Sequence, residues 1–574
     1  MISKASVKRV LGDIPLTAEA YWLIRQGGKP PSKSFSFDRL EKSLPDWCKQ
    51  AQQSAASSQA AGTGAASRKI LVFCTLRYWI NYCSLLCIAL SGLGHQVTFA
   101  YLPYANWWSK KTRFNIRRQN AYARKVLKLA SPCIQPVSLY DLENQIAGKA
   151  NSMIGLPPAL EESIRDLSLR DAQYTLQVEE IDMEDVESES GRLYQLRLAR
   201  NRRTAQTIYE WLRNLDSGQR PDIVITPNGS ILEMGAAFQT ARYLGIPTTT
   251  FEFGEQRGRI WFDLNREVMI QNTDDMWNAR KNTPFTDQQK ERVGDLYASR
   301  QNASLWNNFS RLWQEQPGQG GEDARKDLNL DERPLVLLAA NVIGDSLTLG
   351  RQVFSRNMTE WLERSTRQFA DRKDAQLIIR VHPGEKYTQG PSVADLVRRT
   401  LPEIPEHIRL IEADAKVNTY DLIEIADLGL VYTTTVGMEM AMSGIPVIAA
   451  GRTHYRGKGF TLDPDSWQDY LDTLDKVLDS PADFALSNEQ LKQVWHYAYC
   501  FFFEYPCPFP WHLRDFWDEI EKWDIEKVLG AEGRAMFGDV FRYLTGEQRD
   551  WSKPPALIPF TSVEQEISVM NNQV

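Results

Sequence analysis

Residues 422–451 read Leu-Ile-Glu-Ile-Ala-Asp-Leu-Gly-Leu-Val-Tyr-Thr-Thr-Thr-Val-Gly-Met-Glu-Met-Ala-Met-Ser-Gly-Ile-Pro-Val-Ile-Ala-Ala-Gly, and they decide the fold. An apolar strand over 428–432 runs into three threonines. A helical segment follows and ends at Gly444, before a second strand begins at Pro446. A buried strand, a tight turn, a helix and another buried strand form the repeating unit of a parallel α/β sheet. The segment therefore predicts a Rossmann-type domain in the second half of the chain.

The turn between that strand and that helix has the composition of an anion site. The first N–H groups of a helix have no helical partner, and the positive end of the helix dipole lies beside them, which suits a phosphate. Glu439, one turn further along, can accept hydrogen bonds from sugar hydroxyls. The same pattern also fits an ordinary strand–helix–strand unit whose threonines only cap the helix. The predicted anion site consists of Thr433, Thr434, Thr435, Val436 and Gly437.

A second strand of the same half also ends in polar residues. Residues 376–385 read Gln-Leu-Ile-Ile-Arg-Val-His-Pro-Gly-Glu, a buried strand that stops at His382-Pro383. Proline cannot donate to the sheet and biases the preceding residue toward extended backbone. The imidazole is therefore expected at the carboxyl end of a strand, where open α/β sheets bind ligands. A lone histidine is more often structural, but two such strand ends in one domain favour a shared binding site. Arg380 and Glu385 add charge nearby.

These motifs belong to an ordered series. The series resembles the nucleotide-binding half of bacterial GT-B glycosyltransferases, most closely the capsule-synthase type enzymes of surface polysaccharides. It is similar, more distantly, to bacterial sialyltransferases that carry a His-Pro motif. The resemblance spans residues 330–480. Its segments are Arg-Val-His-Pro-Gly-Glu at 380–385, Asn-Thr-Tyr-Asp-Leu at 418–422, Thr-Thr-Thr-Val-Gly-Met-Glu at 433–439, Gly-Ile-Pro-Val-Ile at 444–448, and Gly-Arg-Thr-His-Tyr-Arg-Gly-Lys-Gly-Phe-Thr at 451–461.

The resemblance implies an α/β fold of the GT-B type, with two doubly wound parallel-sheet domains that face each other across a cleft. It implies a metal-independent transferase that takes a nucleotide-sugar donor, with a CMP-linked acidic sugar as one expectation, and a glycan or lipid-linked acceptor. From their position after a strand, Tyr455, Arg456 and Lys458 are expected either to close over the donor or to form a surface turn. The implied donor-binding residues are Arg380, His382, Pro383, Glu385, Thr433, Thr434, Thr435, Val436, Gly437 and Glu439.

The remaining chain divides around these motifs. Residues 1–67 form an N-terminal extension in which the small-residue run 51–67 is interpreted as a flexible linker. Residues 68–330 begin with a β-α-β pattern and predict the first Rossmann-like domain, with a helical insertion at 105–215. Residues 331–485 are the second domain. Residues 486–574 predict C-terminal helices that could cross back to the first domain.

Residues that follow the predicted strands of the first domain supply the other side of the cleft. Glu252 and Glu255 follow one strand and are the main candidate catalytic bases, because a carboxylate at a strand end can take the proton of an acceptor hydroxyl. Asp345 of the second domain is an alternative base. With His382 they form the predicted catalytic set. Three further strand-end residues are expected to bind the acceptor: Arg77, Tyr78 and Asn228.

Composition limits the other possibilities. The net charge of −6 gives no reason to expect nucleic-acid binding. The seven cysteines lack metal or disulfide spacing, and no stretch of ~18 uncharged apolar residues predicts a membrane span. The expected location is therefore cytoplasmic. A basic run from Lys110 to Lys128, beside Trp107 and Trp108, could contact an anionic membrane surface at the inner membrane face, or be a solvated helix face.

Two other functions fit the same motifs. A CDP-polyol phosphotransferase of the teichoic-acid type shares this architecture but needs a second histidine in the cleft, and His454 is the candidate. The other is a non-catalytic scaffold that binds nucleotide or carbohydrate. It would need the binding pocket but no catalytic carboxylate.

Overall fold

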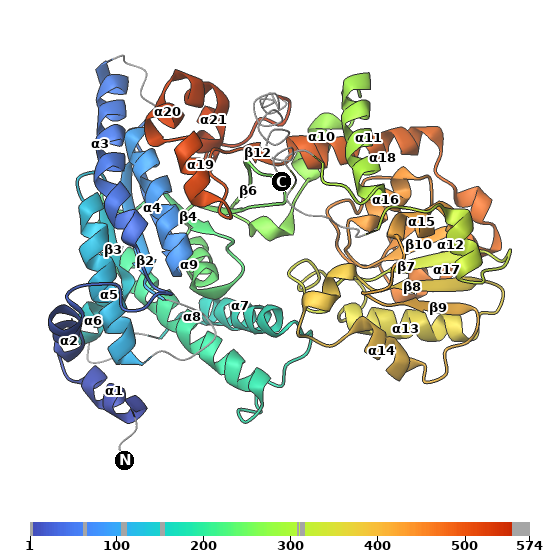
Figure 1. The fold of residues 1–574 in the computed structure, drawn as a ribbon, viewed down its shortest axis with the longest axis horizontal. Coiled ribbons are helices and arrows are strands. Elements are labelled where there is room, and N and C mark those ends of the chain that lie inside the picture. The colour runs from blue at the N-terminus through green and yellow to red at the C-terminus, as the bar shows by residue number, and fades with distance from the viewer. Residues whose placement is uncertain are drawn as a thin grey trace, which may run out of the picture.

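The computed structural model describes residues 4–60, 66–104, 112–149, 155–306, 309 and 316–553. It contains two α/β domains side by side, with the first on the left and the second on the right of Figure 1. The prediction of two Rossmann-type domains is confirmed, with one difference: the first sheet carries antiparallel strands at one edge.

The first sheet has seven strands in the order β12-β6-β5-β4-β1-β2-β3. The five strands from β5 to β3 are parallel, whereas β6 runs antiparallel to β5, and β12 antiparallel to β6. The strands are β1 (Lys69–Thr75), β2 (Gln96–Leu102), β3 (Gln135–Ser138), β4 (Ile223–Pro227), β5 (Thr248–Glu252), β6 (Arg259–Leu264) and β12 (Cys507–Pro508).

The second sheet has five parallel strands in the order β11-β10-β7-β8-β9. Along β7, Leu335 and Leu337 belong to one buried cluster, and Val336 and Leu338 to another, so both faces of the sheet are covered. The strands are β7 (Leu335–Ala339), β8 (Gln376–Arg380), β9 (Ile408–Ile411), β10 (Leu428–Val431) and β11 (Val447–Ala449).

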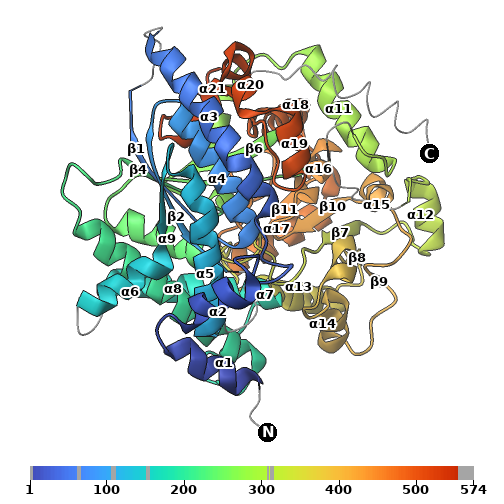
Figure 2. The same ribbon diagram turned by 60° about the vertical axis from the view of Figure 1, so that its left-hand side comes forward.

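Helices surround both sheets (Figures 1 and 2). The N-terminal half contains α1 (Lys4–Asp13), α2 (Thr17–Gln26), α3 (Asp38–Ala60), α4 (Arg77–Gly92), α5 (Arg113–Leu127), α6 (Leu139–Lys149), α7 (Pro158–Leu176), α8 (Glu189–Arg213) and α9 (Leu232–Tyr243). The connection between the domains contains α10 (Asp274–Arg280), α11 (Asp287–Gln301) and α12 (Gly321–Asp327). The second domain contains α13 (Met358–Ala370), α14 (Val393–Thr400), α15 (Thr419–Ile425), α16 (Val436–Met442) and α17 (Trp467–Asp479).

The C-terminal segment returns to the first domain. α18 (Asn488–Tyr499) packs on the second domain against α16 and α11. The chain then adds β12 to the first sheet, and α19 (Phe516–Lys522), α20 (Ile525–Leu529) and α21 (Ala531–Leu544) follow, with α20 against α3. The C-terminal segment was predicted to cross back to the first domain, and it does so, which joins the two domains.

Two predictions about the first half were wrong. Residues 51–60, interpreted as part of a flexible linker, continue helix α3, and residues 61–65 lie outside the described part. Alanine favours helix, and small residues allow close packing: a Cβ on Gly92 of α4 would lie 3.1 Å from Ala51 Cα. The proposed helical insertion at 105–215 also contains β3, so α5 is a crossover helix of the first sheet.

Part of the basic run falls outside the described residues, namely Trp107, Trp108, Lys110 and Lys111. Its described part is largely α5, and most of its basic side chains face polar or acidic partners. Ion pairs therefore neutralise much of the charge predicted to contact a membrane. The ion pairs are Arg113–Asp13, Arg117–Glu19, Arg124–Asp141 and Lys125–Glu41. Within the described ranges, no helix has the length and apolar character needed to cross a bilayer.

A buried ion pair ties the interdomain connection to the C-terminal segment. Arg280 of α10 donates to both carboxylate oxygens of Glu504, at 2.8 and 2.9 Å, and both side chains are buried. We expect Arg280→Ala to lower the free energy of unfolding by about 3–5 kcal/mol, because it leaves a buried carboxylate without its counter-ion. Urea denaturation measures the change. Lys290→Ala removes an exposed ion pair with Asp287 and should cost less than about 0.5 kcal/mol. Equal effects of the two variants would contradict the expectation.

Candidate functional site

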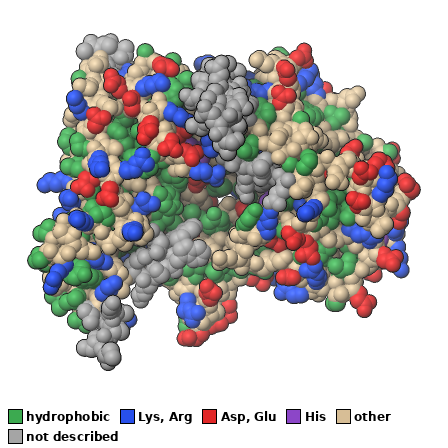
Figure 3. Space-filling view, in the orientation of Figure 1, with side chains coloured by type: hydrophobic (Ala, Val, Ile, Leu, Met, Phe, Trp, Pro, Cys, Tyr) green, Lys and Arg blue, Asp and Glu red, His purple; other side chains and the backbone are tan. Residues whose placement is uncertain are grey.

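A cavity of about 560 Å³ lies between the two domains. The space-filling view shows the surface hollowed there (Figure 3). The cavity wall includes the polypeptide that follows β10, β7 and β8, three adjacent strands of the second sheet, and the loop that follows β5 of the first. The carboxyl ends of parallel strands are where open α/β sheets bind ligands. The cavity therefore brings together both strand-end motifs that the sequence predicted.

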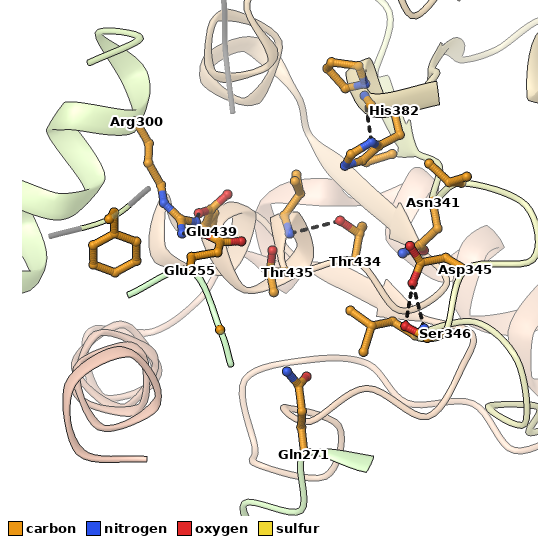
Figure 4. Close-up of a pocket in the computed structure, with 18 of the residues that line it drawn as sticks. Glu255, Gln271, Arg300, Asn341, Asp345, Ser346, His382, Thr434, Thr435 and Glu439 are labelled. Carbon is orange, nitrogen blue, oxygen red and sulfur yellow. Dashed lines mark hydrogen bonds and ion pairs between the residues drawn. The ribbon is translucent and has the colours of Figure 1, made fainter. Parts of the chain in front are cut away.

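His382 follows β8 and lines the cavity beside Pro383 (Figure 4). Its backbone is extended, as predicted, with ψ 126°. The Nδ1 atom accepts a hydrogen bond from the Gly384 N–H at 3.0 Å. An accepting Nδ1 fixes the neutral tautomer with the proton on Nε2. The side chain is therefore oriented to donate through Nε2–H. An imidazole can act as a neutral hydrogen-bond donor or as a charged imidazolium, and this geometry favours the neutral donor.

The threonine loop that follows β10 contributes two of its three threonines to the cavity. Thr434 and Thr435 line it, together with Val436. Thr433 does not: its N–H and hydroxyl both donate to Asn341 Oδ1, at 3.1 and 3.3 Å. Asn341 itself lines the cavity, where it follows β7. The sequence prediction included Thr433 and missed Asn341, whose position after a buried strand was the signal that could have found it.

Gly437 and Tyr455 support the threonine loop from beneath. A Cβ on Gly437 would lie 2.3 Å from the Tyr455 hydroxyl oxygen, so glycine is required for this close approach. The Tyr455 hydroxyl donates to the Thr434 carbonyl at 2.6 Å, and its side chain is fully buried. The predictions that Gly437 contacts the phosphate and that Tyr455 closes over the donor are therefore wrong, because both residues lie under the loop that they support.

Two buried arginines line the cavity without a carboxylate partner among the described residues. Arg380 donates to the carbonyl oxygens of Glu412 and Val417, and burial lowers its pKa to about 10. Arg259 of β6 donates to the carbonyl oxygens of Phe503 and Pro506, and burial lowers its pKa to about 10 as well. A buried guanidinium without a counter-ion is costly. The cavity therefore has an unmet preference for negative charge, and Arg259 is a residue that the sequence prediction missed.

A third arginine connects carboxylates from the two domains. Arg300 of α11 forms an ion pair with Glu439 of α16, and its Nη2 atom lies 3.7 Å from Glu255 Oε2 (Figure 4). The Tyr420 hydroxyl donates to the other Glu439 oxygen at 3.1 Å. Both Glu439 oxygens are thus already engaged, although the residue lines the cavity as predicted. Glu255 also lines the cavity, and Arg300 attracts its carboxylate toward the second domain. The polar helix α11 gave no sequence signal for Arg300.

The other predicted residues lie outside this cavity wall. Glu385 accepts hydrogen bonds from Ser392 Oγ at 2.8 Å and from the Val393 N–H, so it caps α14 and its predicted role in donor binding is wrong. Glu252 accepts from Asn228 Nδ2 at 3.0 Å, and burial raises its pKa. Asn228, Arg77 and Tyr78 follow β4 and β1, at the carboxyl edge of the first sheet.

His454, the second histidine of the phosphotransferase alternative, is not part of the cavity wall. It is buried, stacks on Phe501 with ring centroids 3.8 Å apart, and its Nδ1 lies 2.9 Å from the Tyr497 hydroxyl. Burial lowers its pKa to about 3, so it stays neutral. Asp463, in the Asp-Pro-Asp sequence at 463–465, accepts from the Gly457 N–H and the Thr461 hydroxyl and so stabilises the loop before α17, whose N-cap is Ser466.

The fold and this site define a class: a two-domain α/β protein with an anion-favouring cavity at the strand ends between its sheets. Comparison with known families is more specific than this class: residues 271–502 match the family model of the capsule polysaccharide biosynthesis protein. Over that part, which is less than half of the chain, the protein is similar to this family. The predicted resemblance is thereby confirmed. No curated protein matches the sequence.

Solved structures show distant similarity. KpsC β Kdo 2,4 transferase from Thermosulfurimonas dismutans is 15% identical, with 57% of this chain and 88% of that chain covered and a TM-score of 0.32. KpsC β Kdo 2,7 transferase from the same organism is 16% identical, with 52% and 81% covered and a TM-score of 0.30. A glycosyltransferase from Rickettsia africae is 10% identical, with 84% and 100% covered and a TM-score of 0.24.

Proposed function

We propose that the protein is a glycosyltransferase of capsule polysaccharide biosynthesis, which moves a sugar from a nucleotide donor to a glycan or lipid-linked acceptor. One observation carries the proposal: a cavity between two Rossmann-type domains places an imidazole N–H donor and a buried, carboxylate-free guanidinium beside hydroxyl-rich strand ends. The family match over residues 271–502 supports it.

The leaving group of such a transfer is a nucleotide phosphate, whose negative charge grows as the sugar–oxygen bond breaks. His382 donates its Nε2–H to a phosphate oxygen, and Thr434, Thr435 and Asn341 supply hydroxyl and amide groups around it. Arg380 provides a fixed positive charge in the same wall. Donors held in place before the reaction stabilise the developing charge without reorganisation. We propose that these residues perform this step without a metal ion, so that a chelator leaves the rate unchanged.

The donor sugar is proposed to be acidic and CMP-linked. A CMP-linked sugar acid carries two separate anions, one phosphate and one carboxylate. The cavity has two separate buried guanidinium groups that lack carboxylate partners, Arg380 from the second domain and Arg259 from the first. One guanidinium for each anion would satisfy both charges. A neutral sugar would leave Arg259 without a counter-ion.

Deprotonation of the acceptor hydroxyl is assigned to Glu255. Its carboxylate lines the cavity on the side of the first domain, and Arg300 holds it opposite Glu439. Figure 4 places Thr435 between this carboxylate cluster and His382. A donor that spans the cavity would therefore present its phosphate to His382 and its anomeric carbon toward Glu255. The phosphotransferase alternative gains no support, because His454 lies outside the cavity wall.

Thermal denaturation with CMP, UDP, GDP and CDP tests the donor proposal. A ligand at 100 times its Kd stabilises the folded protein by about 2.7 kcal/mol. We expect CMP to raise the melting temperature most, and expect Arg380→Gln to reduce that shift. The Lys416→Gln variant, which changes an exposed charge on the same domain, serves as the control. A larger shift with UDP would contradict the cytidine donor, and no shift with any nucleotide would contradict the glycosyltransferase itself.

A further inference from the structure

The outer face of the α1–α2 hairpin exposes large apolar side chains. Leu16 is 73% exposed, Leu23 62% and Ile24 78%, and Val10 and Ile14 of the same hairpin are exposed as well. The hairpin lies at the lower edge of the molecule in both ribbon views, away from the interdomain cavity (Figures 1 and 2). Large apolar side chains exposed together on one short segment usually mark a surface that binds something.

The opposite face of the hairpin is anchored, which fixes the exposed face outward. Trp22 is buried and donates its Nε1–H to the Lys29 carbonyl at 2.8 Å, while the Tyr21 ring packs against Phe114 of α5 at 5.4 Å between centroids. Arg117 of α5 donates to the carbonyl of Ile14 at 2.7 Å. At the bend Leu16 has φ 63°, in the left-handed region that a branched side chain rarely adopts. A Leu that is both strained and exposed adds nothing to the core.

In the hairpin and the segment that follows it, the charged side chains without a partner among the described residues are all basic. The acids of the hairpin, Asp13 and Glu19, pair with Arg113 and Arg117 of α5. The exposed basic residues have no carboxylate partner among the described residues, and they are Lys8, Arg9, Arg25, Lys29 and Lys33. Apolar side chains flanked by unpaired basic residues are the pattern by which helices lie in the interface of an anionic bilayer. A symmetric contact between two copies would bring the same basic residues together, which disfavours self-association.

We propose that the α1–α2 hairpin docks the protein on an anionic lipid bilayer, with Leu16, Leu23 and Ile24 inserted between headgroups and the basic residues against them. This surface differs from the basic run at 110–128, where ion pairs engage much of the charge. The proposal does not depend on the reaction at the cavity. It brings the protein to a membrane surface, where a lipid-linked acceptor would be found.

Vesicle co-sedimentation of the full-length protein tests this docking. Wild type should bind vesicles of phosphatidylglycerol and phosphatidylethanolamine, bind phosphatidylcholine vesicles far more weakly, and lose affinity as salt rises. The combined variant Lys8→Gln, Arg9→Gln and Arg25→Gln should bind on the order of 100-fold more weakly, because each basic residue near an anionic surface contributes about fivefold. The combined variant Leu16→Ser, Leu23→Ser and Ile24→Ser should lose binding even at low salt.

A matched control removes apolar exposure elsewhere. Met183→Ser with Val186→Ser changes two exposed residues between α7 and α8 and should bind vesicles as wild type does. Circular dichroism confirms that each variant is folded. The proposal would be overturned if the wild-type protein does not bind anionic vesicles, or if the serine variant binds them with the affinity of wild type. Ultracentrifugation that shows a dimer, broken by the serine variant, in a protein that does not bind vesicles would assign the face to self-association instead.

Discussion

His382→Ala is expected to lower kcat/KM for nucleotide-sugar transfer by about 100- to 1,000-fold, the loss typical of one donor removed from a developing anion. The reason is geometric: the Gly384 N–H occupies Nδ1, so Nε2 carries the proton that meets the phosphate. Steady-state kinetics with the donor identified by thermal shift measures the effect.

Two companion variants separate this role from a structural one. His382→Gln keeps an N–H donor near the Nε2 position and should recover a large part of the lost rate. His95→Ala alters a histidine of the first domain whose Nδ1 accepts from the Arg68 N–H, and it should leave kcat/KM unchanged. An undiminished rate in His382→Ala would remove the imidazole from the mechanism.

Glu255→Gln is expected to reduce kcat by about 100- to 10,000-fold, the range of general base catalysis, while the donor Kd stays close to that of wild type. The substitution keeps the shape of the side chain and removes the base. Single-turnover kinetics gives the rate, and calorimetry gives the Kd.

Glu252→Gln is the matched comparison. Glu252 engages Asn228 and the Phe253 N–H and lies outside the cavity wall, so its replacement should cost much less. A larger loss in Glu252→Gln than in Glu255→Gln would transfer the role of base to Glu252. If the wild-type protein binds the donor but transfers no sugar to any glycan or lipid-linked acceptor, the non-catalytic scaffold becomes the better interpretation than a glycosyltransferase.

The strand ends were predictable because hydrophobic runs are local signals. The strand before His382 and the strand before Thr433 are continuous apolar segments, and parallel strands end at the same edge of a sheet, so both turns were expected at that edge. That only β7 separates them was not predictable. The orientation of individual side chains was not predictable in the same way. Thr433 donates to Asn341, which is distant in the chain, and Glu385 accepts from the start of α14 a few residues later, a local contact that no residue pattern announced.

The arginines show the limit of sequence analysis most clearly. Arg300 and Arg259 come from a polar helix and from an antiparallel strand, neither of which carries a motif. Their significance depends on burial and on which carboxylates they do or do not meet, and both are properties of contacts distant in the chain. The small residues at 51–60 were wrongly predicted to be part of a flexible linker for a related reason. Packing on α4, which composition does not reveal, stabilises this segment as a helix.

In the proposed mechanism, the turns that follow β8 and β10 hold the phosphate of a nucleotide in the cavity between the domains. A crystal structure of the complex with CMP tests it most directly. We expect the phosphate within hydrogen-bonding distance of His382 Nε2 and of the Thr434 or Thr435 hydroxyl, with Arg380 in the surrounding wall. A nucleotide bound elsewhere, or bound in this cavity with its phosphate turned away from both turns, would contradict it.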